Sequence, residues 1–122
     1  MLRKYLAAVL AVAVLAPSAA SADVMTWKLR SFSKNAIEVA FYSQNRRTEW
    51  PGGGKVYVNR TYDTVSYPLT CIKGEKICYG AWLKGNSSRY WGMGQGGKQK
   101  CTNCCYTCGG NTSTQIHNLN EH

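Results

Sequence analysis

The stretch Met25-Thr26-Trp27-Lys28-Leu29-Arg30 decides the class of fold. Its apolar residues alternate with polar ones, so side chains two positions apart form one apolar face. A period of two with aromatic and branched side chains is typical of a half-buried β-strand. The same period recurs in Ile37-Glu38-Val39-Ala40-Phe41-Tyr42, after the short polar link Ser33-Lys34-Asn35. We therefore expect two strands that pair as an antiparallel hairpin.

Further strands are expected over residues 55–58, 64–71 and 89–93, and no segment after residue 22 has a helical period. Pro68, within the second of these, predicts an edge strand or a bulge because proline cannot donate a ladder hydrogen bond. Turn signals recur about every ten residues. Together these patterns predict an all-β fold, a small antiparallel β-sandwich or barrel, stabilised by disulfides.

A second hairpin is predicted at Cys71-Ile72-Lys73-Gly74-Glu75-Lys76-Ile77-Cys78, which is symmetric about Gly74 and Glu75. Glycine at the first central position suits a two-residue type II′ turn. In that register Cys71 lies opposite Cys78, within the distance that a disulfide spans. The second strand of this hairpin would continue as far as Leu83.

Six cysteines in a small exported chain predict a disulfide framework. They are Cys71, Cys78, Cys101, Cys104, Cys105 and Cys108. In an extended segment Cys104 and Cys105 point to opposite faces, so they should have different partners. Two schemes stay open. Either Cys71 bonds to Cys78 and the cluster pairs internally, or both of these cysteines reach into the cluster.

The run Cys101-Thr102-Asn103-Cys104-Cys105-Tyr106-Thr107-Cys108 also raises an alternative, a metal site or a thiol-redox centre. Its four cysteines, Cys101, Cys104, Cys105 and Cys108, form two C-x-x-C pairs. Zinc sites place a spacer between such pairs, and here there is none. A redox C-x-x-C motif normally lies in a βαβ pattern, which is not evident here. We therefore favour a structural role, with no metal and no cofactor.

The N-terminus predicts export. Arg3 and Lys4 precede the apolar run Leu6–Leu15, and a small-residue cleavage site ends at Ala22. These are the parts of a cleaved signal peptide, and the run is too short to span a membrane. We expect a secreted or periplasmic protein without a transmembrane segment. Its parts would be a signal peptide (1–22), a single β domain (23–110) and a flexible polar tail (111–122).

Charge indicates the class of partner. Without Arg3 and Lys4, 13 lysines and arginines stand against 6 acidic residues, a net charge of +7. The basic residues are dispersed rather than concentrated on one element, which argues against nucleic acid. An anionic glycan, a cell-wall polymer or a membrane surface fits a basic exported protein better. The alternative interpretation is that the positive charge only keeps the protein soluble.

No catalytic constellation is evident. The two histidines, His117 and His122, lie in the polar tail, and the acidic residues are scattered. We therefore expect a protein that is not an enzyme, with exposed aromatic and arginine side chains that stack on sugar rings and hold acidic groups. The candidate binding residues are Arg46, Arg47, Trp50, Arg89, Tyr90 and Trp91. The predicted function is a non-catalytic binding or envelope-associated module for an anionic partner.

Overall fold

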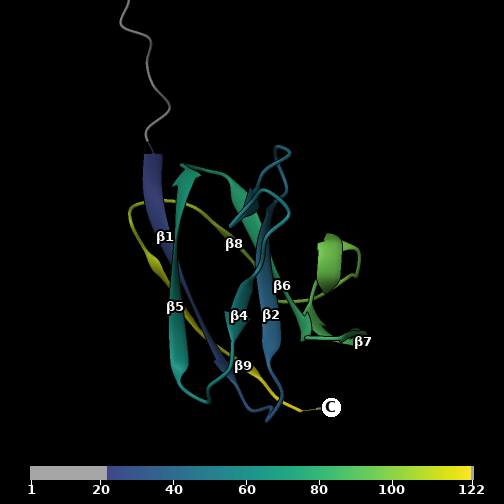
Figure 1. The fold of residues 1–122 in the computed structure, drawn as a ribbon. Helices are drawn as coiled ribbons and strands as arrows, with labels where there is room; N and C mark the ends of the chain where they lie inside the picture. Colours follow the sequence, from purple (N-terminus) through teal and green to yellow (C-terminus); the bar gives the residue numbers. More distant parts are fainter. Residues whose placement is uncertain (1–21, 122) are drawn as a thin grey trace, which may run out of the picture.

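Two β-sheets packed face to face make up the protein in a computed structural model that describes residues 22–121 (Figure 1). The first sheet contains β5 (Thr64–Ile72), β1 (Ala22–Ser31) and β9 (Ser113–Leu119), in that order. The second contains β3 (Glu49–Trp50), β2 (Ile37–Ser43), β6 (Lys76–Leu83) and β7 (Asn86–Gly92), with β4 (Tyr57–Asn59) paired to β2 and β8 (Cys105–Thr107) paired to β6. The predicted all-β, disulfide-bonded sandwich is therefore confirmed.

The core lies between the two sheets and follows the period-two pattern. On β1, Met25, Trp27 and Leu29 are at most 2% exposed, while the residues between them face outward. The Trp27 ring packs on the Phe41 ring of β2 with 5.3 Å between centroids. Tyr67 of β5 packs on the same Phe41 ring at 5.4 Å. The aromatic side chains of both sheets thus interlock across the sandwich.

The expected β1–β2 hairpin does not form. β1 pairs with β5 and β9, whereas β2 pairs with β3, β4 and β6. The link between them crosses from one sheet to the other. The serine side chains of this link accept hydrogen bonds from its own backbone N–H groups. Ser31 Oγ accepts one from Ser33 N, and Ser33 Oγ accepts one from Asn35 N, both at 3.0 Å. Each strand has an apolar face, and placing these two faces opposite each other across the sandwich buries both.

The predicted hairpin over residues 71–78 is also wrong. Glu75 N donates to Ile72 O at 2.8 Å, and Gly74 has φ +90°, so the turn is centred on Lys73 and Gly74. A positive φ at the third position is the type II arrangement that glycine favours. The turn carries the chain from β5 of the first sheet to β6 of the second, and these two strands do not pair.

The disulfides follow the second of the two open schemes. Cys71 bonds to Cys108, and Cys78 bonds to Cys105. Cys101 bonds to Cys104. Cys71 and Cys78 are not bonded to each other, because each has its partner in the eight-residue run. Cys104 and Cys105 have different partners, as their alternation predicts.

The expected loose tail is instead largely a strand. β9 runs parallel to β1, and Leu119 is fully buried in the core. This pair departs from the expected antiparallel arrangement, which the other strand pairs keep. The β9 sequence STQIHNL has no clear alternation, because an edge strand with few buried side chains needs little apolar sequence.

The predicted signal peptide, residues 1–22, lies outside the described residues apart from Ala22, which begins β1. Across the described range of 22–121, no helix is long and apolar enough to cross a membrane.

Candidate functional site

The fold does not bring the six candidate binding residues together: Trp50 pairs with Phe41 at one edge of the second sheet, Trp91 pairs with Ala81 at the other edge, and the arginines lie towards opposite ends of the strands. β2 and β6 are antiparallel, with Ile37 opposite Leu83 at one end and Ser43 opposite Ile77 at the other. Arg46 and Arg47 lie in the loop after Ser43, whereas the pocket beside Trp91 includes Leu83. Six residue steps along β2 correspond to about 20 Å. The sequence therefore grouped residues that the fold places in two separate regions.

Arg46 has a structural role at the first end. Its Nε and Nη2 atoms donate to Oε2 and Oε1 of Glu75, the second bond measuring 3.0 Å. Ser43 Oγ donates to Oε2 at 2.6 Å, and Ile72 N donates to Oε1 at 3.0 Å. The Glu75 side chain is only 2% exposed. Arg46 thus neutralises a carboxylate buried under the turn that joins β5 to β6.

These bonds set the protonation of Glu75. Burial by itself raises the pKa of a carboxyl group, but the hydrogen bonds from Arg46, Ser43 and the Ile72 backbone outweigh it. The pKa of Glu75 is lowered from 4.5 to about 2. The ion pair with Glu75 raises the pKa of Arg46. Both groups are therefore charged at neutral pH.

Trp50 also serves the fold. Its Nε1 atom donates to Thr70 O on β5 at 3.1 Å, so the indole links the two sheets. The Arg46 guanidinium lies over its ring, 5.9 Å from the centroid. Arg47 is exposed and lines a shallow groove together with Met93 and Gly97. This end offers Arg47 to a partner, while Arg46 and Trp50 are engaged within the protein.

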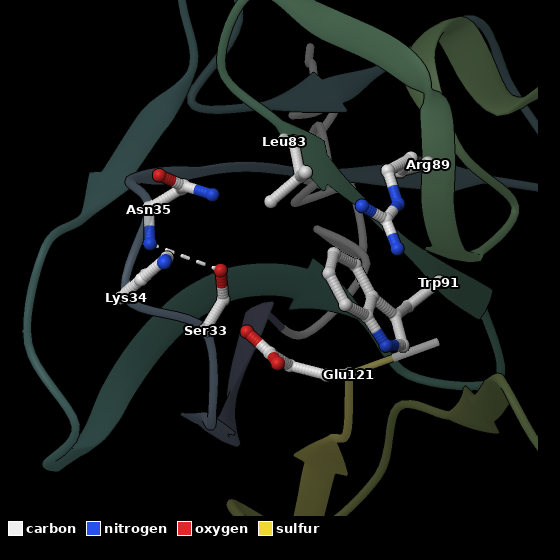
Figure 2. Close-up of a pocket in the computed structure, with 7 residues that line it drawn as sticks. All are labelled: Ser33, Lys34, Asn35, Leu83, Arg89, Trp91 and Glu121. Atoms are coloured by element: carbon white, nitrogen blue, oxygen red, sulfur yellow. Dashed lines mark hydrogen bonds between the residues drawn. The ribbon is translucent and has the colours of Figure 1, made fainter.

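The other end carries a pocket of about 160 Å³ beside Trp91 (Figure 2). It is lined by Ser33, Lys34, Asn35, Leu83, Arg89, Trp91 and Glu121. Leu83 and Ser33 are buried, whereas the charged side chains are exposed. Figure 2 shows these side chains surrounding a common space, with the Trp91 ring between the Arg89 guanidinium and the Glu121 carboxylate. The site therefore combines an aromatic wall with a polar rim that carries two cations and one anion.

Three segments far apart in the sequence position this pocket. Trp91 Nε1 donates to Asn120 O at 2.7 Å and so holds the end of the chain next to β7. Lys84 N donates to Ala36 O at 3.0 Å, which fixes residues 33–36 beside the end of β6. The β1–β2 link, the β6–β7 hairpin and the residues after β9 thus meet at one place.

Tyr90 does not join this pocket. It packs against the cluster formed by Ala40, Tyr42 and Trp82 on the outer face of the second sheet. Neighbouring residues of a strand point to opposite faces, so Tyr90 and Trp91 are separated. The structure adds Ser33, Lys34, Asn35, Leu83 and Glu121 to the predicted Arg89 and Trp91. No local signal marks these added residues, because only the folded chain brings them together.

The cysteines proposed as metal ligands are not gathered as the alternative expected. Cys108 is bonded to Cys71. The sulfur atoms that do lie together, within 4.8 Å of one another, are those of Cys78, Cys104 and Cys105. Cys108, the last cysteine of the eight-residue run, therefore lies outside this cluster of sulfur atoms, beside Cys71 of β5.

His117 lies among aromatic rings rather than in a loose tail. Its ring stacks on Trp27 with 5.5 Å between centroids and contacts Tyr79 and Tyr106 at 5.1 and 5.4 Å. Its Nε2 atom is buried, with no hydrogen-bond partner among the described residues. Burial lowers the pKa of His117 below 6.5. The geometry makes His117 a packing residue that fixes β9 onto the core.

Comparison with known proteins finds no matching family model, no similar curated sequence and no similar solved structure. The fold and site define the chain as a disulfide-bonded all-β sandwich with a small aromatic and charged pocket.

Proposed function

We propose that this chain is an exported, non-catalytic binding module for an anionic partner, an acidic glycan or cell-wall polymer. The observation that carries the proposal is the pocket beside Trp91, where one indole ring shares a hollow with Arg89 and Lys34. Of the six predicted binding residues, the proposal keeps the two that line this pocket, Arg89 and Trp91.

The chemistry of the lining suits an acidic sugar. An indole ring offers a flat apolar face on which the C–H face of a sugar ring packs. A guanidinium binds carboxylate or sulfate through two parallel hydrogen bonds, and the Asn35 amide and Ser33 hydroxyl are hydrogen-bonding groups for sugar hydroxyls. Glu121 is a further acceptor. Two cations against one anion favour a negatively charged unit.

The size of the pocket limits what enters it. At about 160 Å³ it is well below the roughly 300–1,000 Å³ of most small-molecule sites. A single sugar-sized unit would occupy it, while the rest of a polymer would lie along the surface. The excess of basic residues over acidic ones then adds a long-range attraction that is sensitive to salt.

The compartment indicated by the disulfides is one in which such a partner occurs. Three disulfides indicate an oxidising environment, extracellular or periplasmic. Glycans and wall polymers are exposed in these spaces, and export by the predicted signal peptide would bring the protein there.

Titration calorimetry tests the proposal with two oligosaccharides of equal length, one of uronic acids and one neutral. We expect the acidic one to bind more tightly and its affinity to fall as salt rises to about 0.5 M. Arg89→Ala should weaken binding by about tenfold or more, because it removes charge-assisted hydrogen bonds. Equal, salt-independent binding of both oligosaccharides would remove the anionic part of the proposal.

Arg47→Ala is the matched control. It removes the same charge from an exposed arginine at the opposite end of the second sheet. We expect it to change the affinity much less than Arg89→Ala does. If Arg47→Ala abolishes binding and Arg89→Ala leaves it intact, the pocket beside Trp91 is not the binding site.

A further inference from the structure

Two of the three disulfides lie side by side. Cys104 Sγ is 3.5 Å from Cys105 Sγ, although the two atoms belong to different bonds. The sulfur atoms of Cys78, Cys104 and Cys105 all lie within 4.8 Å of one another, and Cys101 is bonded to Cys104. Three sulfur atoms, from β6, β8 and the loop before β8, thus lie close together, and the Cys101 sulfur is joined to them through its bond to Cys104.

These separations are on the scale of a tetrahedral thiolate site. A Zn–S bond of about 2.3 Å in a tetrahedron places the sulfur atoms about 3.8 Å apart. The contact between Cys104 and Cys105 already approaches this value. The two bonded pairs would each have to open by about 1.7 Å once their disulfides were reduced. Side-chain rotation provides movements of this size.

The backbone would hold the sulfur atoms together without the disulfides. β6 and β8 pair in the register Lys76–Thr107, Ile77–Tyr106 and Cys78–Cys105. Tyr79 N also donates to Cys104 O at 3.0 Å. The Ile77 side chain of this ladder is fully buried in the core. Backbone pairing and packing therefore hold Cys78, Cys104 and Cys105 in place, and Cys101 lies in the loop three residues before Cys104.

We propose that Cys78, Cys101, Cys104 and Cys105 bind one Zn²⁺ ion when their two disulfides are reduced. The ligand set differs from one drawn from the eight-residue run alone, because Cys78 of β6 replaces Cys108. Only three ligands then come from the eight-residue run, and the fourth comes from another strand, so the run does not have to supply all four ligands by itself. The site is independent of the proposed pocket function.

The chemistry requires a dithiol or phosphine reductant. Two molecules of a dithiol each reduce one disulfide, pass two electrons and two protons to its sulfur atoms, and become cyclic disulfides themselves. Zn²⁺ then displaces the four thiol protons and binds four thiolates, which leaves a net charge of −2 at the site. In the reverse step, two molecules of the cyclic disulfide take up four electrons and four protons, become dithiols again, and the two protein disulfides re-form as Zn²⁺ is released. The cluster thus holds either two disulfides or one metal ion.

Cobalt titration tests the proposal on the full chain. The protein is reduced with a phosphine, freed of the reductant without oxygen, and titrated with Co²⁺ and then Zn²⁺. We expect one Co²⁺ per chain with the visible and near-ultraviolet bands of a four-thiolate tetrahedral site, and displacement by Zn²⁺. Near-ultraviolet circular dichroism should retain the signal of the packed aromatic core. No binding at one equivalent, or binding only after this signal is lost, would overturn a preassembled site.

Two variants identify the ligands. Cys78→Ser removes one proposed ligand and should weaken Co²⁺ binding about 100-fold and change the spectrum. The control Cys71→Ser/Cys108→Ser removes the third disulfide, whose sulfur atoms lie outside the cluster. It should keep the stoichiometry and the four-thiolate spectrum. If the control loses the spectrum while Cys78→Ser keeps it, the ligands are those of the eight-residue run.

Discussion

Removal of the Glu75 carboxylate should make the protein less stable at neutral pH but not in acid. Glu75→Gln replaces the charged group with a neutral amide of similar shape, beneath the turn from β5 to β6. The buried carboxylate accepts hydrogen bonds from Arg46, Ser43 and the Ile72 backbone. These partners favour the charged form, and an amide gains no charge attraction from Arg46.

The size of the effect follows from the protonation of Glu75. Its pKa is lowered from 4.5 to about 2 on folding, which corresponds to at most about 3 kcal/mol. The Arg46 side chain is 40% exposed, and solvent screening reduces the benefit to about 1–2 kcal/mol. A carboxyl group with a lowered folded pKa stabilises the fold above the unfolded value. The stabilisation is lost as the pH falls from 4.5 towards 2.

Urea unfolding from about pH 7 to pH 2 measures this effect. We expect the difference in unfolding free energy between wild type and Glu75→Gln to be about 1–2 kcal/mol at pH 7 and to shrink towards zero at pH 2. Arg46→Ala should reduce the same pH dependence, because Ser43 and the Ile72 backbone still favour the charged carboxylate, and Arg47→Ala should leave it unchanged. A difference that stays constant over the whole pH range would refute the reasoning.

Three further outcomes are expected. Replacing Cys71 and Cys108 by serine opens the short loop between this disulfide and the nested Cys78–Cys105 bond and should lower the unfolding free energy in urea by about 3 kcal/mol. Gly80→Ala places a Cβ atom 2.2 Å from the Gly94 carbonyl oxygen and should cost about 3 kcal/mol, whereas Gly109→Ala meets no neighbouring atom and should change thermal stability little. The pKa of His117 measured by NMR should lie below 6.5, because burial disfavours the charged imidazolium. Since the unfolded chain then binds the proton more readily, the protein should become less stable as the pH falls below 6.5. A midpoint at or above 6.5 would contradict this burial.

The strands with clear alternation are the part of the fold that sequence predicts well. Trp27, Phe41 and Tyr67 each lie on the apolar side of a period-two segment, and each is buried as expected. The reason is local: successive side chains of a strand point to opposite faces, so the apolar set must face the core. β9 lacks such a pattern and is held by pairing with β1, so it was predicted as a tail.

The pairing of the strands required the tertiary structure. A strand with one apolar face can bury that face either when it pairs with the next strand in the same sheet or when it packs against that strand from the opposite sheet. The alternation of apolar and polar residues is the same in both arrangements. For the same reason the turn at Gly74 was assigned to a hairpin instead of a crossing between sheets. The partners of Cys71 and Cys78 stayed open between two schemes for the same reason, and the structure selects the scheme in which both bond to the eight-residue run.

By itself the sequence determined an all-β chain with alternating buried faces and enough cysteines for three disulfides. It also marked Arg89 and Trp91 as candidates for binding. Only the tertiary structure decided that Arg46 neutralises Glu75, that Trp91 shares a pocket with Glu121, and that Cys78 joins the sulfur cluster. The physical reason is the same in each case: periodicity is fixed by adjacent residues, whereas a site forms from residues that only long-range pairing brings together.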